Sequence, residues 1–265
     1  MADFLAGMAR SSRARADAAG TFTDSDFDRP VVPLSLDGFG VIAEIKQRSP
    51  AEGALASVDS DRVGRASTYA SAGATAISVL TEPERFDGAL QHLDEVAAAC
   101  PQTPVMRKDF LVDTVQVLEA RKAGASGVLL IAAMLDDATL ADMIDASFEH
   151  GMFVLLESFD EDDLRRSRTL VARYGDDVVH GRLLFGVNTR NLRTLEVDPD
   201  RLERFAPLLP DGFNVAESGL TSAGDAERVA SWGYRLALVG TALMRADDPA
   251  ALVADMRAAG SGAAA

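Results

Sequence analysis

Eight short apolar segments alternate with amphipathic segments along the chain, and this alternation constrains the fold more than any other sequence feature. The apolar segments lie at residues 41–45, 75–80, 104–108, 126–132, 152–157, 183–188, 213–217 and 235–240. Many of the amphipathic segments begin with Asp or Thr and end with Gly, as helices do. Because strands that alternate with helices pair in parallel, the pattern predicts an α/β fold with a parallel sheet.

The number of repeats and the composition of the strands favour a closed sheet. Near-continuous apolar strands are typical of a sheet that is covered on both faces. An eightfold repeat favours a barrel over an open sheet, and no G-x-G-x-x-G motif follows the first strand, which weakens a dinucleotide-binding fold. We therefore expect an α/β protein with a (β/α)8 TIM barrel, whose usual size agrees with the chain length of 265 residues.

An extra segment precedes the first strand. Residues 1–20 have an apolar side, which predicts a helix, and residues 20–39 have the composition of a connecting loop. The barrel then spans residues 41–258. Residues 259–265 are rich in Gly and Ala, and we expect a frayed tail there. The whole chain, residues 1–265, is thus predicted to be one barrel domain with an extra N-terminal helical segment.

The composition excludes several classes of partner. The formal net charge is −15, whereas nucleic acids require clusters of Lys and Arg. No run approaches the roughly 18 apolar residues of a membrane-spanning helix, and the N-terminus lacks a signal-peptide pattern. Cys100 is the single cysteine, and His92, His150 and His180 lack the spacing of metal ligands. We expect no nucleic-acid or membrane partner, no metal and no cofactor, in a cytoplasmic monomer or weak homo-oligomer.

Lysine is rare in this chain. Lys46, Lys108 and Lys122 stand among 23 arginines. Lysine is a compact proton donor whose pKa shifts with its surroundings, and arginine cannot replace it in that role. Lys46 and Lys108 lie at the ends of apolar segments, so we expect a chemical reason for keeping them. Lys122 lies within a predicted helix, where chance explains it equally well.

Polar side chains interrupt the apolar segments at their carboxyl ends. Glu44 and Lys46 are two residues apart, so on a strand both point to the same side. In a (β/α)8 barrel the carboxyl ends of all strands meet at one end, where active sites lie. The polar residues there are Glu44, Lys46, Lys108, Glu157, Asn188, Arg190, Glu217 and Ser218. The sequence therefore predicts an ionic site at this end of the barrel.

Simpler interpretations of single residues stay open at this point. Glu44 and Lys46 are compatible with a structural ion pair, and Lys108 with a solvated turn. Asn188 and Arg190 are compatible with ordinary turn residues. The convergence of all of them on one end of the barrel favours a functional site.

Two glycine-containing turns, at residues 216–220 and 238–244, follow the last two predicted strands. In (β/α)8 barrels these loops and a short extra helix commonly hold a phosphate, since glycine lets the backbone approach and free N–H groups attract an anion. Gly219, Gly240 and Thr241 are the candidate ligands, and we expect a short helix to begin at Thr241. A chain of this negative charge needs local cations to attract a phosphate. The candidates are Lys46, Arg48, Lys108 and Arg190.

Six motifs, in order, resemble those of the indole-3-glycerol phosphate synthase family of tryptophan biosynthesis. They are AEIKQRSPAEG (43–53), AISVLTEPERFDGAL (76–90), VMRKDFLVDTVQVLEARKAGASGVLLI (105–131), GVNTRNLRTLEVD (186–198), VAESGL (215–220) and LVGTALM (238–244). The resemblance runs from about Val41 to Asp255, and the extra N-terminal segment also matches. It implies an enzyme, a carboxy-lyase, that closes the ring of 1-(2-carboxyphenylamino)-1-deoxyribulose 5-phosphate with loss of CO₂ and water, giving indole-3-glycerol phosphate.

The resemblance also implies roles for individual residues. Lys108 would be the general acid that protonates the ketone oxygen, and Glu157 the base of the later dehydration. Lys46 would pair with a substrate anion and protonate the departing hydroxyl. Glu44 and Glu217 would orient and tune the lysines. The remaining residues would bind the substrate, with Asn188, Ser218, Ser49 and Arg190 at its oxygens and anionic groups, and Gly219, Gly240 and Thr241 at its phosphate.

The chain departs from the family pattern at three places. Ala51 replaces a Ser that often follows the Ser-Pro pair, and the fifth strand reads LLESF around Glu157. Residues 173–182 are an apparent insertion, which we place at the amino end of a strand, away from the site. Because the neighbours of Glu157 would shape the aromatic pocket, a related ring-closing enzyme with an altered aromatic substrate is an alternative.

Two further functions are alternatives. A sugar-phosphate isomerase on a similar barrel would use another acid–base pair and would lack the E-x-K-x-x-S-P segment. A barrel that only binds a phosphorylated ligand would have lost the polar residues at its strand ends, and this chain keeps them.

Overall fold

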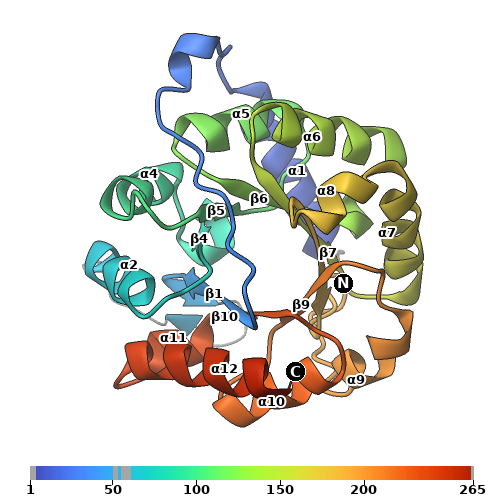
Figure 1. Cartoon of the computed structure of the whole chain (residues 1–265). Helices are drawn as coiled ribbons and strands as arrows, with labels where there is room; N and C mark the ends of the chain where they lie inside the picture. Colours follow the sequence, from blue (N-terminus) through green and yellow to red (C-terminus); the bar gives the residue numbers. More distant parts are fainter. Residues whose placement is uncertain (1–3, 50–52, 55–60, 264–265) are drawn as a thin grey trace.

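Eight parallel strands close into a barrel, and helices surround it (Figure 1). The computed structural model describes residues 4–49, 53–54 and 61–263. The barrel strands are β1 (Gly40–Ile45), β4 (Ala76–Leu80), β5 (Val105–Lys108), β6 (Gly127–Ile131), β7 (Phe153–Ser158), β8 (Leu183–Asn188), β9 (Phe213–Glu217) and β10 (Leu236–Val239). Strands that are neighbours along the chain pair with each other, and β10 pairs with β1. The predicted (β/α)8 TIM barrel is confirmed, with every strand within one residue of its predicted ends.

Many helices begin where the sequence supplies a capping side chain. Five side chains each accept a hydrogen bond from a backbone N–H in the first turn of the helix that follows. They are Asp61, Asp113, Asp136, Asp160 and Ser222. The helices around the barrel are α2 (Arg62–Ser71), α3 (Pro83–Phe86), α4 (Leu90–Ala99), α5 (Thr114–Lys122), α6 (Asp137–Glu149), α7 (Glu161–Arg173), α8 (Gly175–Val179), α9 (Arg201–Phe205), α10 (Ala223–Ser231), α11 (Thr241–Arg245) and α12 (Pro249–Ala263). Shorter elements are the 3₁₀ turns η1 (Asp24–Asp26), η2 (Ala132–Met134) and η3 (Ala206–Leu208) and the hairpin of β2 (Arg48–Ser49) with β3 (Gly53–Ala54).

Alternate strand residues build two separate apolar layers. Ile42, Met106 and Leu155 belong to a layer inside the barrel. Val41 and Val154 belong to a second layer, between the sheet and the surrounding helices. Successive side chains of a strand point to opposite faces, so a strand that is covered on both faces needs apolar residues throughout. This explains the near-continuous apolar segments of the sequence.

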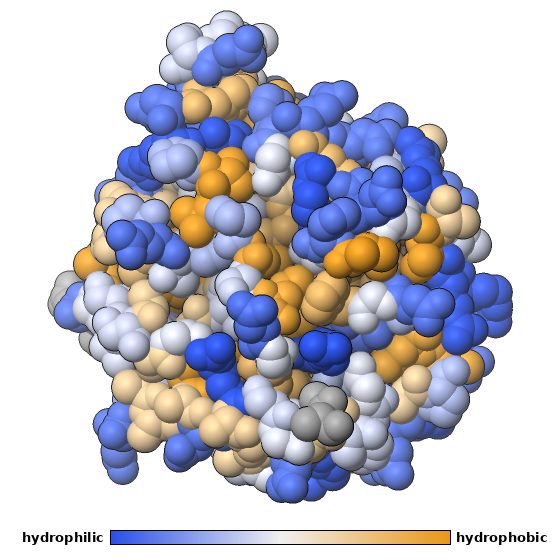
Figure 2. Space-filling model, in the orientation of Figure 1, coloured by the Kyte–Doolittle hydropathy of each residue, from blue (hydrophilic) through white to orange (hydrophobic). Residues whose placement is uncertain are grey.

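The N-terminal segment covers both ends of the barrel. Helix α1 (Phe4–Asp17) lies at the carboxyl end of the strands, where Leu5 and Met8 pack against the inner apolar layer. The chain then passes α5 and crosses the amino end of the barrel to reach β1, and Leu34 and Leu36 pack against the inner layer from there (Figure 1). Figure 2 shows apolar residues gathered at the centre of this face within a more hydrophilic periphery. The expected extra N-terminal helix is therefore present, and the loop after it closes the opposite end.

The C-terminal end differs from the expectation of a frayed tail from residue 259. Residues 259–263 continue helix α12. The backbone N–H of Phe39 donates a hydrogen bond to the Ser261 hydroxyl at 2.9 Å. A Cβ atom at Gly260 would lie 2.3 Å from the Phe39 ring, so the helix packs there as closely as glycine permits. Tertiary contacts thus stabilise a helical stretch whose glycines disfavour a helix by themselves.

The structure adds detail to two other segments of the predicted pattern. The amphipathic segment between β8 and β9 forms α9 followed by the 3₁₀ turn η3, because Pro207 lacks the N–H group that would continue an α-helix. The apparent insertion at 173–182 contains α8 and leads directly into the amino end of β8. No helix in the described part of the chain is long and apolar enough to cross a membrane.

Candidate active site

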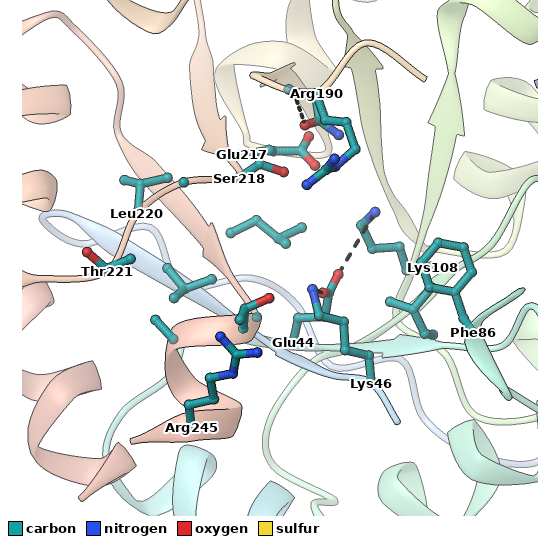
Figure 3. Close-up of a pocket in the computed structure, with 18 of the residues that line it drawn as sticks. Glu44, Lys46, Phe86, Lys108, Arg190, Glu217, Ser218, Leu220, Thr221 and Arg245 are labelled. Atoms are coloured by element: carbon teal, nitrogen blue, oxygen red, sulfur yellow. Dashed lines mark hydrogen bonds and ion pairs between the residues drawn. The ribbon is translucent and has the colours of Figure 1, made fainter. Parts of the chain in front are cut away.

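A cavity of about 680 Å³ opens at the carboxyl end of the barrel. Strands β1, β5, β8 and β9 and the turns after β9 and β10 supply its polar lining (Figure 3). The predicted residues that line it are Glu44, Lys46, Lys108, Asn188, Arg190, Glu217, Ser218, Gly219, Gly240 and Thr241. Glu157 is fully buried and contacts Lys108. The structure therefore brings residues from widely separated parts of the sequence around one cavity.

Two lysines and two glutamates form one connected ionic cluster. Lys46 Nζ lies 2.9 Å from Glu44 Oε1. Lys108 Nζ lies 3.9 Å from Glu44 Oε2 and 3.7 Å from Glu157 Oε2. The Asn188 side-chain amide donates a hydrogen bond to Glu157 Oε1 at 3.1 Å. Both contacts of Lys108 are longer than hydrogen bonds, so its ammonium group can still donate a short one to a ligand in the cavity.

The alternation of side chains along each strand places these charges. Glu44 comes two residues after the inward-facing Ile42, and Lys108 comes two residues after the inward-facing Met106. Each therefore continues the inner face of its strand one step beyond the apolar layer. The same holds for Glu157 on β7. Charged groups gather where the apolar interior of the barrel ends.

Burial and neighbouring charges shift the pKa values of Lys108 and Glu44 in opposite directions. Burial disfavours the charged form of Lys108, but the carboxylates of Glu157, Glu44 and Glu217 outweigh it and raise the pKa of Lys108 above its ordinary value. Burial also disfavours the Glu44 carboxylate, but Lys46 and Lys108 outweigh it and lower the pKa of Glu44. Lys108 and Glu44 are therefore both charged near neutral pH.

Glu217 behaves differently from the other glutamates of the cavity. Its side chain is buried, and neither carboxyl oxygen accepts a hydrogen bond from any other described residue. Burial raises the pKa of Glu217 well above its ordinary value, and the nearby Glu157 carboxylate raises it further, against the opposing effect of Lys108. In its protonated form Glu217 can donate a hydrogen bond to the neighbouring Glu157 carboxylate.

The turns after β9 and β10 form one end of the cavity. Ser218 and Gly219 have φ angles of 68° and 79°, a left-handed conformation that is uncommon for serine. Gly240 precedes the short helix α11, which begins at Thr241 as predicted and ends at Arg245. Figure 3 shows Arg245 at this end of the cavity, away from Phe86 at the other. Backbone N–H groups, hydroxyls and a guanidinium suit an anion here.

Apolar side chains also line the cavity, with Phe86 at the end away from Arg245 (Figure 3), and the sequence alone did not assign them. Phe4 of α1, Phe86 of α3, and Leu192 and Leu195 of the loop after β8 line the cavity. Phe4 packs edge-on against Phe110, with ring centroids 5.9 Å apart. Such a wall suits an aromatic ring. The apolar side of the predicted N-terminal helix was the one sequence signal that pointed to it.

Comparison with known proteins identifies the family. A family model described as indole-3-glycerol phosphate synthase matches residues 23–256. The chain belongs to the indole-3-glycerol phosphate synthase family. It is 44% identical to the indole-3-glycerol phosphate synthase of Nocardioides sp. over 248 residues, which cover 93% of this chain and 91% of that protein. It is 46% identical to the enzyme of Parafrankia sp. over 222 residues, which cover 83% of this chain and 78% of the relative.

Solved structures from outside the indole-3-glycerol phosphate synthase family share the barrel. The 3-hexulose-6-phosphate synthase of Salmonella typhimurium superposes with a TM-score of 0.64 at 18% sequence identity, covering 84% of this chain and 99% of that chain. At this identity, the likeness shows the fold alone. The sequence matches carry the family assignment, and they confirm the resemblance that the motifs indicated.

A buried carboxylate fixes α1 beside Lys108 in this member of the indole-3-glycerol phosphate synthase family. Asp109 is fully buried, and Arg15 donates two hydrogen bonds to it, at 2.7 and 2.8 Å. Thr81 donates a third at 2.7 Å. Burial opposes the Asp109 carboxylate, but Arg15 and Arg107 outweigh it and lower the pKa of Asp109 to about 2. Lys108 is thus followed by an ordered, buried residue, which rules out the solvated turn that the sequence left open.

Three other predicted residues lie in different surroundings. The Arg190 guanidinium donates a hydrogen bond to the Leu195 carbonyl at 3.0 Å, at the edge of the cavity. Arg48 is half exposed and lies outside the cavity lining, so it is not part of the cationic cluster that we predicted. The side chain of Ser49 and all of Ala51 lie outside the described residues. Within the described ranges, no group of His, Cys, Asp and Glu side chains could hold a metal ion.

Proposed function

We propose that this chain catalyses the reaction of its family, the ring closure of 1-(2-carboxyphenylamino)-1-deoxyribulose 5-phosphate to indole-3-glycerol phosphate. The observation that supports this most directly is the place of Lys108. It lies between Glu44 and Glu157 in a cavity that has an apolar wall at one end and glycine-containing turns at the other. The substrate has the same layout, with an aromatic ring at one end, a ketone in the middle and a phosphate at the other end.

Lys108 is the general acid of the first step. The ring carbon that carries the carboxylate attacks the ketone carbon, and the electrons of the C=O bond move to its oxygen. That oxygen takes a proton from the Lys108 ammonium group. The raised pKa of Lys108 keeps the proton in place until the more basic alkoxide forms. Loss of CO₂ from the same ring carbon then restores the aromatic ring.

Lys46 and Glu157 carry out the dehydration. The hydroxyl formed in the first step leaves as water after Lys46 protonates it. Glu157 accepts the proton that the substrate loses as the indole double bond forms. Glu44 orients the two lysines from 2.9 and 3.9 Å, and protonated Glu217 orients Glu157 by donating a hydrogen bond to it.

Substrate binding is divided along the cavity. The phosphate is held by the turns after β9 and β10, where Arg245 lies on the same side of α11 as Thr241 and adds a cation. The ligands that we assign are Gly219, Gly240 and Thr241 for the phosphate, Asn188 and Ser218 for neutral oxygens, and Arg190 and Ser49 for anionic groups. The location of the enzyme in the cytoplasm and its state as a monomer or a weak homo-oligomer stay predictions from the sequence.

Indole fluorescence tests the proposal. Purified protein mixed with the substrate should produce the fluorescence of indole-3-glycerol phosphate and an equal amount of CO₂. The analogue without the phosphate is the matched control, and it should react far more slowly because the glycine-containing turns have no group to bind. Silence at high enzyme concentration would contradict the proposal. Faster turnover of a ring-substituted analogue than of the unsubstituted substrate would instead support the alternative with an altered aromatic substrate.

A further inference from the structure

Gly186 lies within β8, beside the pair of carboxyl groups. It pairs in register with Glu157 on β7 and with Val215 on β9. A Cβ atom at Gly186 would lie 2.0 Å from Glu217 Oε1 and 3.2 Å from Glu217 Cδ. Glycine within a strand often marks the close approach of another group, and here that group is the Glu217 carboxyl.

We infer that Gly186 is a positioning residue, whose missing side chain lets the Glu217 carboxyl reach Glu157. This inference rests on the proposed function, because that function makes Glu157 the base of the dehydration and Glu217 the residue that orients it. Glu157 comes from β7 and Glu217 from β9, and β8 is the strand between them. The two side chains must therefore meet over β8. A residue without a side chain at the meeting point leaves the space that the pair occupies.

The kind of atom near Gly186 indicates that alanine would disturb the site more than the fold. The close atoms all belong to side chains, since the next nearest is a methyl carbon of Leu155 at 3.2 Å. The Glu217 carboxyl is the tip of a flexible side chain and can rotate away, so the backbone can stay in place. A methyl group at residue 186 should therefore displace the carboxyl from Glu157 while the barrel folds normally.

Charged groups from several strands face Glu217. They determine how its pKa and the hydrogen bonds of Glu157 would change if the Glu217 carboxyl were displaced. Glu157, Lys108 and Glu44 act on its carboxyl, and Asn188 donates a hydrogen bond to Glu157. Separation of the pair would remove the Glu157 carboxylate from the surroundings of Glu217, and the pKa of Glu217 should fall toward its ordinary value. Glu157 would keep the Asn188 amide and lose its second hydrogen-bond donor. The base of the dehydration step would then be less well oriented.

Turnover of the Gly186→Ala variant tests the inference. A displaced catalytic pair should lower kcat roughly 10- to 100-fold, with little change in KM because Glu217 orients Glu157 and is assigned no contact with the substrate. The same substitution in a Glu217→Ala background should leave kcat unchanged, since no carboxyl is left to displace. Gly127→Ala is the matched control, because a Cβ atom there would meet the Phe153 ring at 2.4 Å in the inner apolar layer. Normal kcat in Gly186→Ala, or an equal loss with and without Glu217, would overturn the inference.

A titration that needs no turnover separates this inference from the proposed function. The protein is labelled with ¹³C at its glutamate carboxyl groups, and the Glu217 signal is assigned by its loss in Glu217→Gln. Glu217 should titrate above the ordinary carboxyl range in the wild-type and Gly127→Ala proteins, and at lower pH in Gly186→Ala. An unchanged titration would overturn the inference even in an active enzyme. A shifted titration in a protein that makes no indole-3-glycerol phosphate would support it and count against the proposed function alone.

Discussion

Lys46 and Lys108 share the carboxylate of Glu44, and their surroundings explain why this chain keeps lysine there. Their side chains are only 15% and 17% exposed. A guanidinium is wider, holds its donors in a fixed plane and does not release its proton, so it cannot act as an acid in this site. Lys122 is 54% exposed and contacts Asp26 at 2.8 Å, where an arginine would serve equally well.

Replacement of Lys46 by arginine should lower turnover by roughly 10²-fold or more, the effect of losing a proton donor. Arginine keeps the positive charge beside Glu44 but cannot protonate the departing hydroxyl. Fluorescence-detected turnover measures the effect, and Lys122→Arg is the matched control that should retain full activity. A fully active Lys46→Arg variant would show that charge alone is needed there.

The charged residues of the site could be predicted from the sequence, and the space between them could not. Glu44 and Glu157 stand out because they interrupt apolar segments at a fixed end. The pairing of Glu157 with Glu217 depends on distances across three strands, and Gly186 gains its meaning only from that pairing. Phe86 likewise reaches the cavity from a short helix that no periodic pattern marks.

At the scale of whole elements, burial decided what could be predicted. The barrel strands are covered on both faces, so their apolar segments define them to within one residue. The end of α12 was missed because it depends on a contact with Phe39, far away in the sequence. The hairpin of β2 and β3 and the short helices α3 and α8 have too few residues to show a period.

Arg15 attaches helix α1 to the barrel through Asp109, so its replacement tests how much this ion pair contributes to holding the helix in place. Arg15→Met should lower the free energy of unfolding by about 1.5–3 kcal/mol, the range for a hydrogen bond to a charged group. Asp109 would stay buried with fewer partners. KM for the substrate should rise, because Phe4 on the same helix lines the cavity.

Urea unfolding and steady-state kinetics measure the two effects of Arg15→Met. Arg10→Met is the matched control, since Arg10 is an exposed residue of the same helix. If the Arg15 variant were as stable as the control and had the same KM, the ion pair with Asp109 would not be what attaches α1.

The molecule as a whole combines an apolar barrel with charges that are buried at one open end. In the proposed function those charges carry out the chemistry, and one carboxyl group among them, Glu217, weakens the fold as the pH rises. The folded state holds a proton on Glu217, whose pKa is raised above the ordinary value of 4.5, whereas the unfolded chain releases that proton above this pH. The contribution of this bound proton to the free energy of unfolding is fully present below the ordinary carboxyl pKa of 4.5. It is lost as the pH rises through the pKa of folded Glu217.

Glu217→Gln removes this dependence, because glutamine has a similar size and does not titrate. Its free energy of unfolding should increase relative to that of the wild-type protein by about 1.4 kcal/mol for each pH unit between the ordinary carboxyl pKa and the raised pKa of folded Glu217, and the difference should stay constant above that. Urea unfolding of both proteins from about pH 5 to about pH 8 measures the difference. A difference that does not change with pH would mean that Glu217 titrates as an ordinary carboxyl group.

Turnover of the Lys108→Ala variant tests most directly whether the ionic cluster carries out the ring closure. Loss of a general acid typically lowers a rate by about 10²–10⁴-fold. Formation of indole-3-glycerol phosphate, followed by fluorescence, should fall by that factor, while circular dichroism shows an intact barrel and Lys122→Ala keeps wild-type turnover. A folded Lys108→Ala variant that turns over the substrate at nearly the wild-type rate would contradict the assignment of Lys108 as the general acid.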